Sequence, residues 1–137
     1  MADGATLTGG CLCGGVRFAF TRASSQVVNC HCSQCRRFHG HFGPYVTIAM
    51  AGVRFDAEAS LTWYQSSAKA RRGFCGVCGA SLFWQKVGGE HLDVAAGSLD
   101  PPTGLATIRH IFVADKSDYY TIDDALERHA GAMPGST

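Results

Sequence analysis

The sequence predicts a mainly β fold with one or two short helices, and three observations support this class. Stretches of alternating, β-branched or aromatic side chains recur along the chain, each bounded by Gly, Pro, Ser or Asp. The 17 glycines concentrate between these stretches and beside the cysteines, where tight turns need them. A helical pattern occurs in only two short segments. With 137 residues, 46% of them hydrophobic, the chain suffices for one domain and is too short for two.

Seven strands are predicted from this pattern. In chain order they are 16–20 (VRFAF), 26–29 (QVVN), 45–50 (YVTIAM), 61–65 (LTWYQ), 81–85 (SLFWQ), 91–96 (HLDVAA) and 107–113 (TIRHIFV). Each is short, and turn residues separate it from its neighbours. Several short strands bounded in this way are typical of all-β domains.

Two short helices are predicted beside the strands. Residues 33–40 (SQCRRFHG) offer Ser33 as an N-cap, and Gly40 is a residue type that commonly ends a helix. Residues 121–130 (TIDDALERHA) begin with Thr121, which is a candidate for a capping box. Neither segment is long enough to organise the fold.

We expect a single domain over residues 1–137, with flexible tails at 1–5 and 131–137, because the chain contains no repeat and no interdomain linker. The N-terminal residues lack the basic and apolar regions of a secretion signal, and no apolar run approaches the ~20 residues that cross a bilayer. A cytoplasmic protein without a membrane partner is therefore expected. The formal net charge of +1, with mixed signs along the chain, gives no reason to expect nucleic-acid binding.

The seven cysteines fall into three tight groups, which is the most informative feature of the sequence. A disulfide framework is disfavoured by the odd number and the missing secretion signal. Cysteines that only fill a core would be scattered. A redox CxxC should open a helix, whereas the residues after the last group, GASLFWQK, indicate a turn and a strand. The groups are CLC (Cys11, Cys13), CHCSQC (Cys30, Cys32, Cys35) and CGVC (Cys75, Cys78).

This spacing indicates metal sites. In CGVCG a tight turn directs both sulfurs to one point, and its glycines permit the backbone conformations that the turn needs. The four glycines of GGCLCGG give the first group the same freedom. We therefore predict a closed four-thiolate zinc site of the structural type on Cys11, Cys13, Cys75 and Cys78. An iron–sulfur cluster is the alternative, but the CxC spacing does not match ferredoxin patterns.

The remaining group, Cys30, Cys32 and Cys35, can hold a second zinc ion but leaves one tetrahedral position open, as catalytic zinc sites do. His39 could close this position as a fourth ligand. His31 is a poorer candidate, because it lies between two ligands and its side chain should point away from the metal. The three thiolates could also simply hold a loop.

The order of these motifs resembles one known family. CxC is followed by CxCxxC opening into RR, then by R-G-F-C-x-x-C-G-x-S-L-F-W, GSLD and HIFV. This pattern, from about Gly9 to Val113, is similar to that of the glutathione-dependent formaldehyde-activating enzyme (GFA) family, to which vertebrate centromere protein V also belongs. The resemblance implies a tent-like all-β fold related to zinc ribbons. It also implies a structural zinc on the first and third cysteine groups and a second zinc on the middle group.

For the founding enzyme of that family, the resemblance implies formation of S-(hydroxymethyl)glutathione from formaldehyde and glutathione, a carbon–sulfur lyase reaction. Zinc would deprotonate an entering thiol and could polarise a carbonyl. Glutathione carries two carboxylates, so its site should offer cations. The arginines that adjoin the cysteine groups are candidates for this role, or they offset the negative charge of the thiolates. They are Arg36, Arg37, Arg71 and Arg72.

Three further polar residues are weaker substrate-binding candidates. Ser98 and Asp100 lie in AAGSLDPP, which is typical of a turn, and they become candidates because the GFA family carries a similar segment. His110 alternates with Ile108 and Phe112 on one face of a predicted strand. A hydrogen-bonded core histidine is therefore favoured over a catalytic base at this position.

Two function classes stay open. One is a zinc-dependent enzyme that acts on a thiol or thioether, with the middle cysteine group holding the working metal. The other is a non-catalytic zinc module that binds protein or nucleic acid, as the centromere relative suggests. Seven thiolates and two divalent ions would turn the net charge of +1 negative, which disfavours a phosphate backbone as partner. The enzyme is therefore preferred, with a glutathione-like thiol as its partner.

Overall fold

The structure is a computed structural model, and it describes residues 4–22 and 25–134. Strands predominate in it, as the sequence predicts. The strands are β1 (Thr6–Gly10), β2 (Arg17–Thr21), β3 (Val27–Cys30), β4 (Gly43–Ala49), β5 (Val53–Ala57), β6 (Leu61–Gln65), β7 (Ala70–Cys75), β8 (Ser81–Lys86), β9 (His91–Ala95), β10 (Thr107–Ile111) and β11 (Glu127–Arg128). The helical elements are α1 (Ser33–His39) and three 3-10 turns, η1 (Met50–Gly52), η2 (Ala96–Ser98) and η3 (Val113–Asp115).

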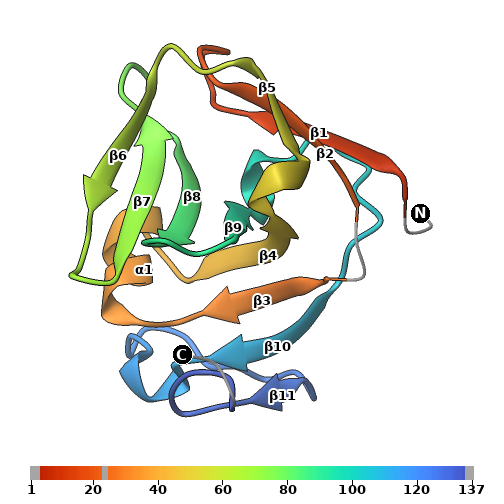
Figure 1. The fold of residues 1–137 in the computed structure, drawn as a ribbon. Helices are drawn as coiled ribbons and strands as arrows, with labels where there is room; N and C mark the ends of the chain where they lie inside the picture. The colour runs from red at the N-terminus through yellow and green to blue at the C-terminus, as the bar shows by residue number, and fades with distance from the viewer. Residues whose placement is uncertain (1–3, 23–24, 135–137) are drawn as a thin grey trace.

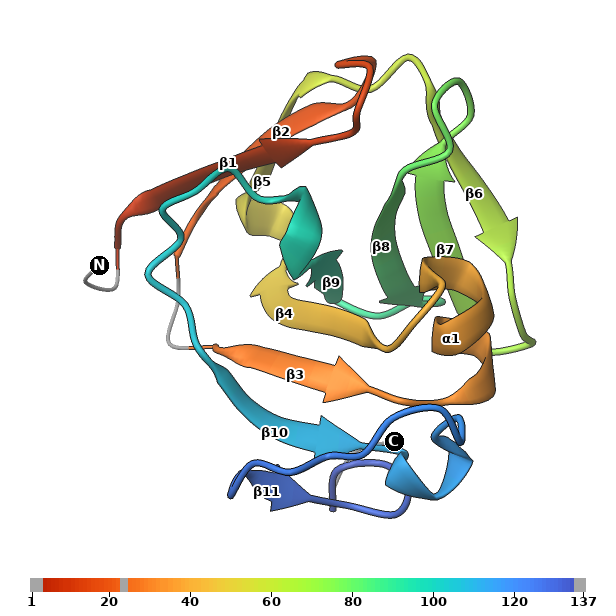
Figure 2. The same cartoon turned by 180° about the vertical axis from the view of Figure 1, so that it is seen from behind.

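The strands form two sheets. The long sheet has the order β11-β10-β3-β4-β9-β8-β7-β6, and the small sheet has the order β1-β2-β5. Within the long sheet β10 runs parallel to β3 and to β11, and the other pairs are antiparallel. This sheet curls, so that β6 to β8 stand across the direction of β3 and β10, with the small sheet at the far end from β10 and β11 (Figures 1 and 2).

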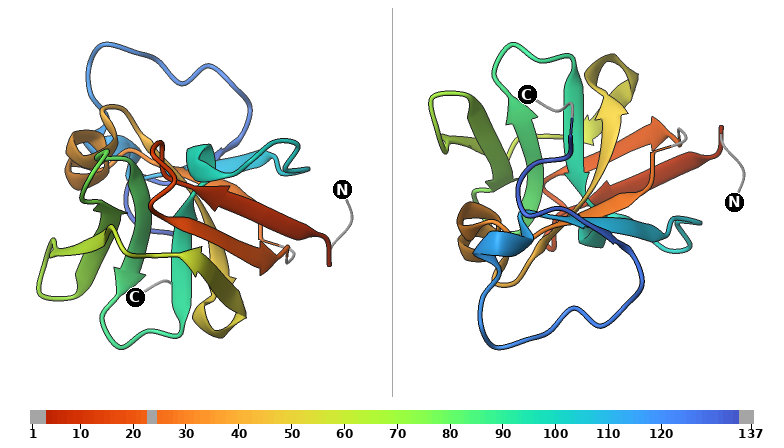
Figure 3. Two further views of the ribbon diagram at one scale, coloured as in Figure 1. Left: turned by 90° about the horizontal axis from the view of Figure 1, so that it is seen from above. Right: turned by 90° about the horizontal axis from the view of Figure 1, so that it is seen from below.

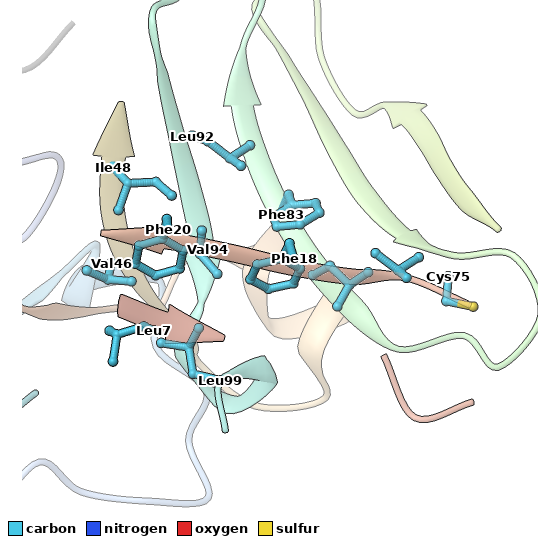
Figure 4. Packing of buried hydrophobic residues seen from close by; sticks show 12 residues of the cluster. Leu7, Phe18, Phe20, Val46, Ile48, Cys75, Phe83, Leu92, Val94 and Leu99 are labelled. Atoms are coloured by element: carbon cyan, nitrogen blue, oxygen red, sulfur yellow. The ribbon is translucent and has the colours of Figure 1, made fainter. Parts of the chain in front are cut away.

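The main core fills the space between the two sheets (Figure 4). Phe18 of β2 lies at its centre, with its ring 5.1 Å from that of Phe83 on β8. Burying each such side chain stabilises the fold by about 1.5–3 kcal/mol. The other labelled members are Leu7, Phe20, Val46, Ile48, Cys75, Leu92, Val94 and Leu99.

The opposite face of the long sheet carries a second set of side chains. Successive residues of a strand point to opposite faces, so Tyr45 and Thr47 of β4, and Asp93 and Ala95 of β9, lie away from the main core. Tyr45 and Ala95 belong to a smaller buried cluster that includes Cys30 and Cys35. The alternation within β4 and β9 therefore gives the sheet one face that packs into the main core and another that packs against Cys30 and Cys35.

All seven predicted strands are confirmed, and two of them are shorter than expected. The stretch predicted as 91–96 ends at Ala95, where η2 begins. The stretch predicted as 107–113 ends at Ile111, because Phe112 adopts a left-handed backbone conformation with φ of 54°. Four strands, β1, β5, β7 and β11, are missing from the sequence prediction. None of the described helices is long and apolar enough to cross a membrane.

The first predicted helix is confirmed as α1, but its N-cap is different. Cys32 caps the helix instead of Ser33, because the Cys32 sulfur accepts a hydrogen bond from the amide of Cys35. At the other end, Gly40 has φ of 84°, a left-handed conformation that glycine adopts without steric cost. A cysteine of the metal-site motif thus also begins the helix.

The second predicted helix, 121–130, is wrong. This segment contains the short strand β11, which pairs in parallel with β10. Asp124, expected inside the helix, instead bonds to the imidazole of His110 and to the amide of Leu126. Tertiary hydrogen bonds therefore outweigh the weak local helical preference. The preceding segment, between η3 and β11, loops out beyond the sheets (Figure 3).

The tails predicted at 1–5 and 131–137 lie partly outside the described residues. Residues 1–3 and 135–137 lie outside them. Within the predicted N-terminal tail, the amide of Gly4 donates to the carbonyl of Arg22 over 2.9 Å. Near the other end, the carbonyl of Gly131 accepts a hydrogen bond of the same length from Phe112.

Candidate functional site

Four cysteines from the two ends of the chain's first 80 residues meet at one point. Cys11 and Cys13 follow β1, Cys75 ends β7, and Cys78 lies in the turn between β7 and β8. Their four sulfurs all lie within 4.8 Å of one another. This is the grouping that the spacing of the motifs predicts, and these residues could hold a metal ion.

Backbone amides prepare this group for negative charge. The amides of Cys78 and Val77 donate to the Cys75 sulfur over 3.3 and 3.4 Å, and the amide of Val16 donates to the Cys11 sulfur over 3.2 Å. The bond from the Cys78 amide, followed by the bond between Cys75 Sγ and the Ser60 hydroxyl, lowers the pKa of Cys75 to about 5. The loops therefore favour a thiolate at Cys75 before any ion is considered, whereas the pKa of Cys13 is raised to about 11, in part by the neighbouring sulfurs of Cys11 and Cys75.

The distances between the sulfurs suit a tetrahedral ion. Cys13 Sγ lies 3.7 Å from both Cys11 Sγ and Cys75 Sγ, and all seven cysteines are free of disulfides. Four ligands around zinc, with Zn–S bonds of about 2.3 Å, are separated from one another by about 3.8 Å. The donor set and its geometry are therefore compatible with zinc.

The middle cysteine group forms a second cluster. Cys30 ends β3, Cys32 caps α1 and Cys35 lies in the first turn of that helix. Their sulfurs also lie within 4.8 Å of one another. Cys30 and Cys35 are buried, and Cys32 is half-buried. A strand end and a helix start therefore hold three sulfurs in one short loop.

The three thiols constrain one another's protonation. Hydrogen bonds from Cys30 and then Cys35 lower the pKa of Cys32 to about 2. The bond between Cys30 and Cys32 raises the pKa of Cys30. One sulfur therefore takes the negative charge, and its neighbour keeps a proton. A bound cation would remove this conflict, because it stabilises thiolates at all three positions.

Neither histidine considered as a fourth ligand belongs to this cluster. His39 Nε2 instead lies 2.5 Å from the Tyr45 hydroxyl. His31 is buried, with an exposed fraction of 1%, and both of its ring nitrogens are engaged elsewhere. Within the described part of the chain, the cluster therefore offers three protein ligands and leaves a fourth tetrahedral position open.

A series of hydrogen bonds runs from the exposed Asp124 through the buried His110 and His31 to the half-buried Tyr120 and supports the loop. His110 Nε2 lies 2.9 Å from Asp124 Oδ2, and its Nδ1 lies 2.9 Å from His31 Nε2. The carboxylate only accepts, so the neutral His110 ring carries its proton on Nε2 and accepts from His31 at Nδ1. His31 Nδ1 is then left to accept from the Tyr120 hydroxyl. The C-terminal segment thereby fixes the residue between two of the clustered cysteines.

The three-cysteine cluster opens onto the larger of two cavities described here, with a volume of about 710 Å³. All three of its cysteines line the wall. Aromatic side chains, including Tyr45 and Trp84, form part of the lining. The charged residues of the lining are Lys69, Arg72, Lys86, Asp93, Arg109 and Asp115. The cavity is therefore large enough for a small organic molecule and rich in positive charge.

Arg72 links the cluster to the sheet. Its side chain is buried, with an exposed fraction of 4%. Its Nη1 and Nη2 lie 3.6 and 3.7 Å from Cys35 Sγ, and Nη1 lies 3.4 Å from the Tyr45 hydroxyl. A guanidinium at this place both offsets thiolate charge and orders the cavity wall.

The other residues proposed from the sequence lie elsewhere. Arg71 points to the opposite face of β7, where it bonds to Gln85 and stacks 3.8 Å over the ring of Trp63. Arg36 and Arg37 lie on α1 and are not among the residues that line the cavity. His110 belongs to the series of hydrogen bonds described above.

Ser98 lines a smaller cavity of about 400 Å³, beside Cys11. Its hydroxyl donates to the carbonyl of Ala95 over 2.7 Å within the η2 turn. Asp100 borders the same space and pairs with Arg17 over 2.6 Å. This polar segment therefore lies next to the four-cysteine group and away from the lining of the larger cavity.

Comparison with known proteins agrees with this geometry. The family described as glutathione-dependent formaldehyde-activating enzyme matches residues 6–115, which include both cysteine clusters. The chain belongs to the GFA family. The match ends at η3, so Tyr120 and Asp124 of the hydrogen-bonded series lie beyond the matched residues.

A solved structure also resembles this GFA chain. It is the crystal structure of a protein from Rhodobacter sphaeroides, 27% identical in sequence, with a TM-score of 0.58. The match covers 71% of the present chain and 91% of the other. This likeness supports the fold of the GFA chain and carries no information about its substrate.

Sequence reasoning missed several residues of the GFA cavity. Asp93, Lys86 and Lys69 line it without belonging to a cysteine motif. A signal was present for Asp93, because it is a lone charge between the apolar Leu92 and Val94 in a predicted strand. Alternation shows that such a residue faces away from the core, but it does not show what covers that face.

Proposed function

We propose that the protein is a zinc-dependent carbon–sulfur lyase-like enzyme that acts on a thiol. Its proposed reaction joins glutathione and formaldehyde to give S-(hydroxymethyl)glutathione, and runs in reverse as the lyase. The description of the GFA family supports the choice of substrates. In this proposal, the four-cysteine group holds a structural zinc and the group of Cys30, Cys32 and Cys35 holds the working zinc.

One observation carries the proposal: three clustered sulfurs, with no fourth ligand among the described residues, line a cavity of about 710 Å³. A closed site would serve the fold alone, whereas an open position at a cavity wall can receive a ligand from solution. The positive charges of the cavity suit a ligand with two carboxylates. The site thus has both a place for sulfur and a match for the rest of glutathione.

The chemistry that zinc would supply is ionisation of the entering thiol near neutral pH. The protein's own residues hold and orient the reactants. Arg72, beside Cys35 and Tyr45, places a positive charge next to the position where the substrate thiolate would bind. In the reaction a carbon–sulfur bond forms, the carbonyl π bond breaks, and the proton that leaves sulfur is balanced by one gained at oxygen.

Exchange spectroscopy with ¹³C-formaldehyde can test this activity. Glutathione and formaldehyde also combine without a catalyst, so the measured quantity is the rate at which the adduct exchanges with free formaldehyde. Zinc-loaded parent protein should accelerate the exchange by at least about tenfold, and Cys32→Ser protein should not. Residual structure in the variant is checked by circular dichroism, and its zinc content by elemental analysis.

The same experiment separates the enzyme from the alternative. No acceleration by protein that holds two zinc ions would contradict the enzyme and leave the non-catalytic zinc module. A module of that kind would bind its protein or nucleic-acid partner through another surface, because a cavity of about 710 Å³ has the size of a small-molecule site. Acceleration that survives Cys32→Ser would show that the middle cysteine group is not the working site.

A further inference from the structure

The floor of the larger cavity contains a row of side chains that crosses four strands. Asp93 of β9 lies directly opposite Thr47 of β4 on one side and Trp84 of β8 on the other. Trp84 in turn lies opposite Arg72 of β7. Residues directly opposite each other share a face of the sheet, and all four line the cavity. A carboxylate and a guanidinium therefore stand on one row with an aromatic ring between them.

Asp93 is an unusual acid within this row. Its Oδ1 accepts a hydrogen bond of 2.6 Å from the Thr47 hydroxyl, and the ion pairs of residues 4–22 and 25–134 do not include it. Burial raises the pKa of Asp93, and the hydrogen bond from Thr47, followed by the nearby His91, opposes this effect. A carboxylate can accept about four hydrogen bonds. Asp93 therefore has unused acceptor capacity in a place where ionisation is costly, and a cationic ligand would relieve that cost.

The row also determines how far apart the backbones of Arg72 and Asp93 lie. Arg72 contacts the Cys35 sulfur, and its strand lies two strands away from that of Asp93. Two strand spacings amount to roughly 10 Å. In an extended γ-glutamyl-cysteine unit the amino nitrogen lies about 9 Å from the sulfur, whereas in free cysteine the two atoms are only about 3–4 Å apart. The backbones of Asp93 and Arg72 are thus roughly 10 Å apart, and Arg72 is the residue of the row that contacts the cluster. An ammonium group on a spacer suits this separation better than the amino group of free cysteine does.

We propose that Asp93 binds the ammonium group of the thiol substrate and thereby selects thiols that carry this group far from sulfur. The inference rests on the proposed function, in which sulfur enters at the three-cysteine cluster. Lys69, which also lines the cavity, suits a carboxylate of such a substrate, whereas Arg109 is already paired with Glu127 over 2.7 Å. Asp115 is the competing acid, but it is exposed, and a hydrated carboxylate contributes little to binding a cation.

Calorimetry with matched ligands tests the role of Asp93. Zinc-loaded parent protein is titrated with glutathione and with glutaryl-cysteinylglycine, which has hydrogen in place of the amino group. The parent should bind glutathione about tenfold more tightly or better, as expected for a charge-assisted hydrogen bond. Asp93→Asn, which keeps an acceptor for Thr47, should bring the ratio of the two affinities close to one. Free cysteine should bind both proteins equally weakly.

Several outcomes would overturn the proposal. Equal affinities of the parent for the two ligands would do so without any variant, even if Asp93→Asn failed to fold. A preference that survives Asp93→Asn, or that is lost in Asp115→Asn instead, would assign the ammonium group to another residue. S-methylglutathione separates this failure from failure of the proposed function. If it binds the parent as well as glutathione does, the entry of sulfur at the cluster is wrong, and the distance argument fails with it.

Discussion

Asp93 shows how a residue can serve binding at the expense of stability. Its carboxylate is held on a cavity wall where burial raises its pKa, so the folded state disfavours the charged form. A raised folded pKa means that the penalty is absent below the unfolded pKa of about 3.9 and grows as pH rises through the folded pKa. Neutral pH is therefore the condition in which this side chain costs the free protein most.

Asp93→Asn should accordingly stabilise the ligand-free protein. At pH 7.5 we expect a higher urea midpoint for the variant than for the parent, and the difference should disappear as the pH is lowered to the unfolded pKa of about 3.9. The neutral amide removes the charge but still accepts from Thr47. A variant less stable than the parent at pH 7.5 would show that the carboxylate already has a stabilising partner in the free protein.

The two cysteine clusters differ in the elements that they connect. The four-cysteine group joins the end of β1 to the turn between β7 and β8, so a metal there closes a long loop of chain. The three-cysteine group stays within the end of β3 and the first turn of α1. Loss of the first metal should therefore affect folding far more than loss of the second.

Matched serine variants can measure this difference. Cys75→Ser should leave most of the protein insoluble or unfolded, because structural zinc contributes on the order of 10 kcal/mol to folding. Cys32→Ser should stay folded, hold about one zinc ion per chain and give a far-ultraviolet spectrum like that of the parent. Solubility and thermal midpoints decide the comparison. Equal midpoints for Cys75→Ser and the parent would contradict a structural role of the four-cysteine group.

The hydrogen bonds that link Asp124, His110 and His31 connect β10 and the C-terminal segment to the loop after β3. His110→Leu would remove both of its central bonds and leave His31 Nε2 buried without a partner. We expect a loss of about 1–3 kcal/mol in the free energy of unfolding, measured with urea. His129→Leu, which removes only a contact to the exposed Glu127, should cost less than about 1 kcal/mol. Similar losses for both variants would mean that the hydrogen bonds of His110 add no specific stability to the fold.

At the scale of the whole molecule, the sequence predicts the fold class and the grouping of cysteines, because both depend on local patterns. The seven expected strands and α1 follow from alternation and turn residues. The division of the cysteines into groups of four and three follows from spacing and is matched by the positions of the sulfurs. Short-range chemistry is sufficient for these features.

Features that depend on distant contacts could not be predicted. The segment 121–130 resembles a helix locally, and only the contact of Asp124 with His110 explains its actual course. Strand β7 was missed because Arg71 and Arg72 make its sequence polar, although Arg72 is buried against Cys35. The cavity residues Asp93 and Lys86 come together through the sheet order β4-β9-β8-β7, which no local pattern specifies.

The central claim is that the three-cysteine cluster holds zinc with a position open to the sulfur of the substrate. Zinc-edge X-ray absorption on protein reconstituted with two zinc ions tests it most directly. Four sulfurs at one site and three at the other predict an average of about 3.5 sulfur ligands per zinc, rising to about 4 with glutathione. S-methylglutathione should cause no such rise. An average of about 4 before glutathione is added, no change on its addition, or an iron signal in elemental analysis would contradict the account.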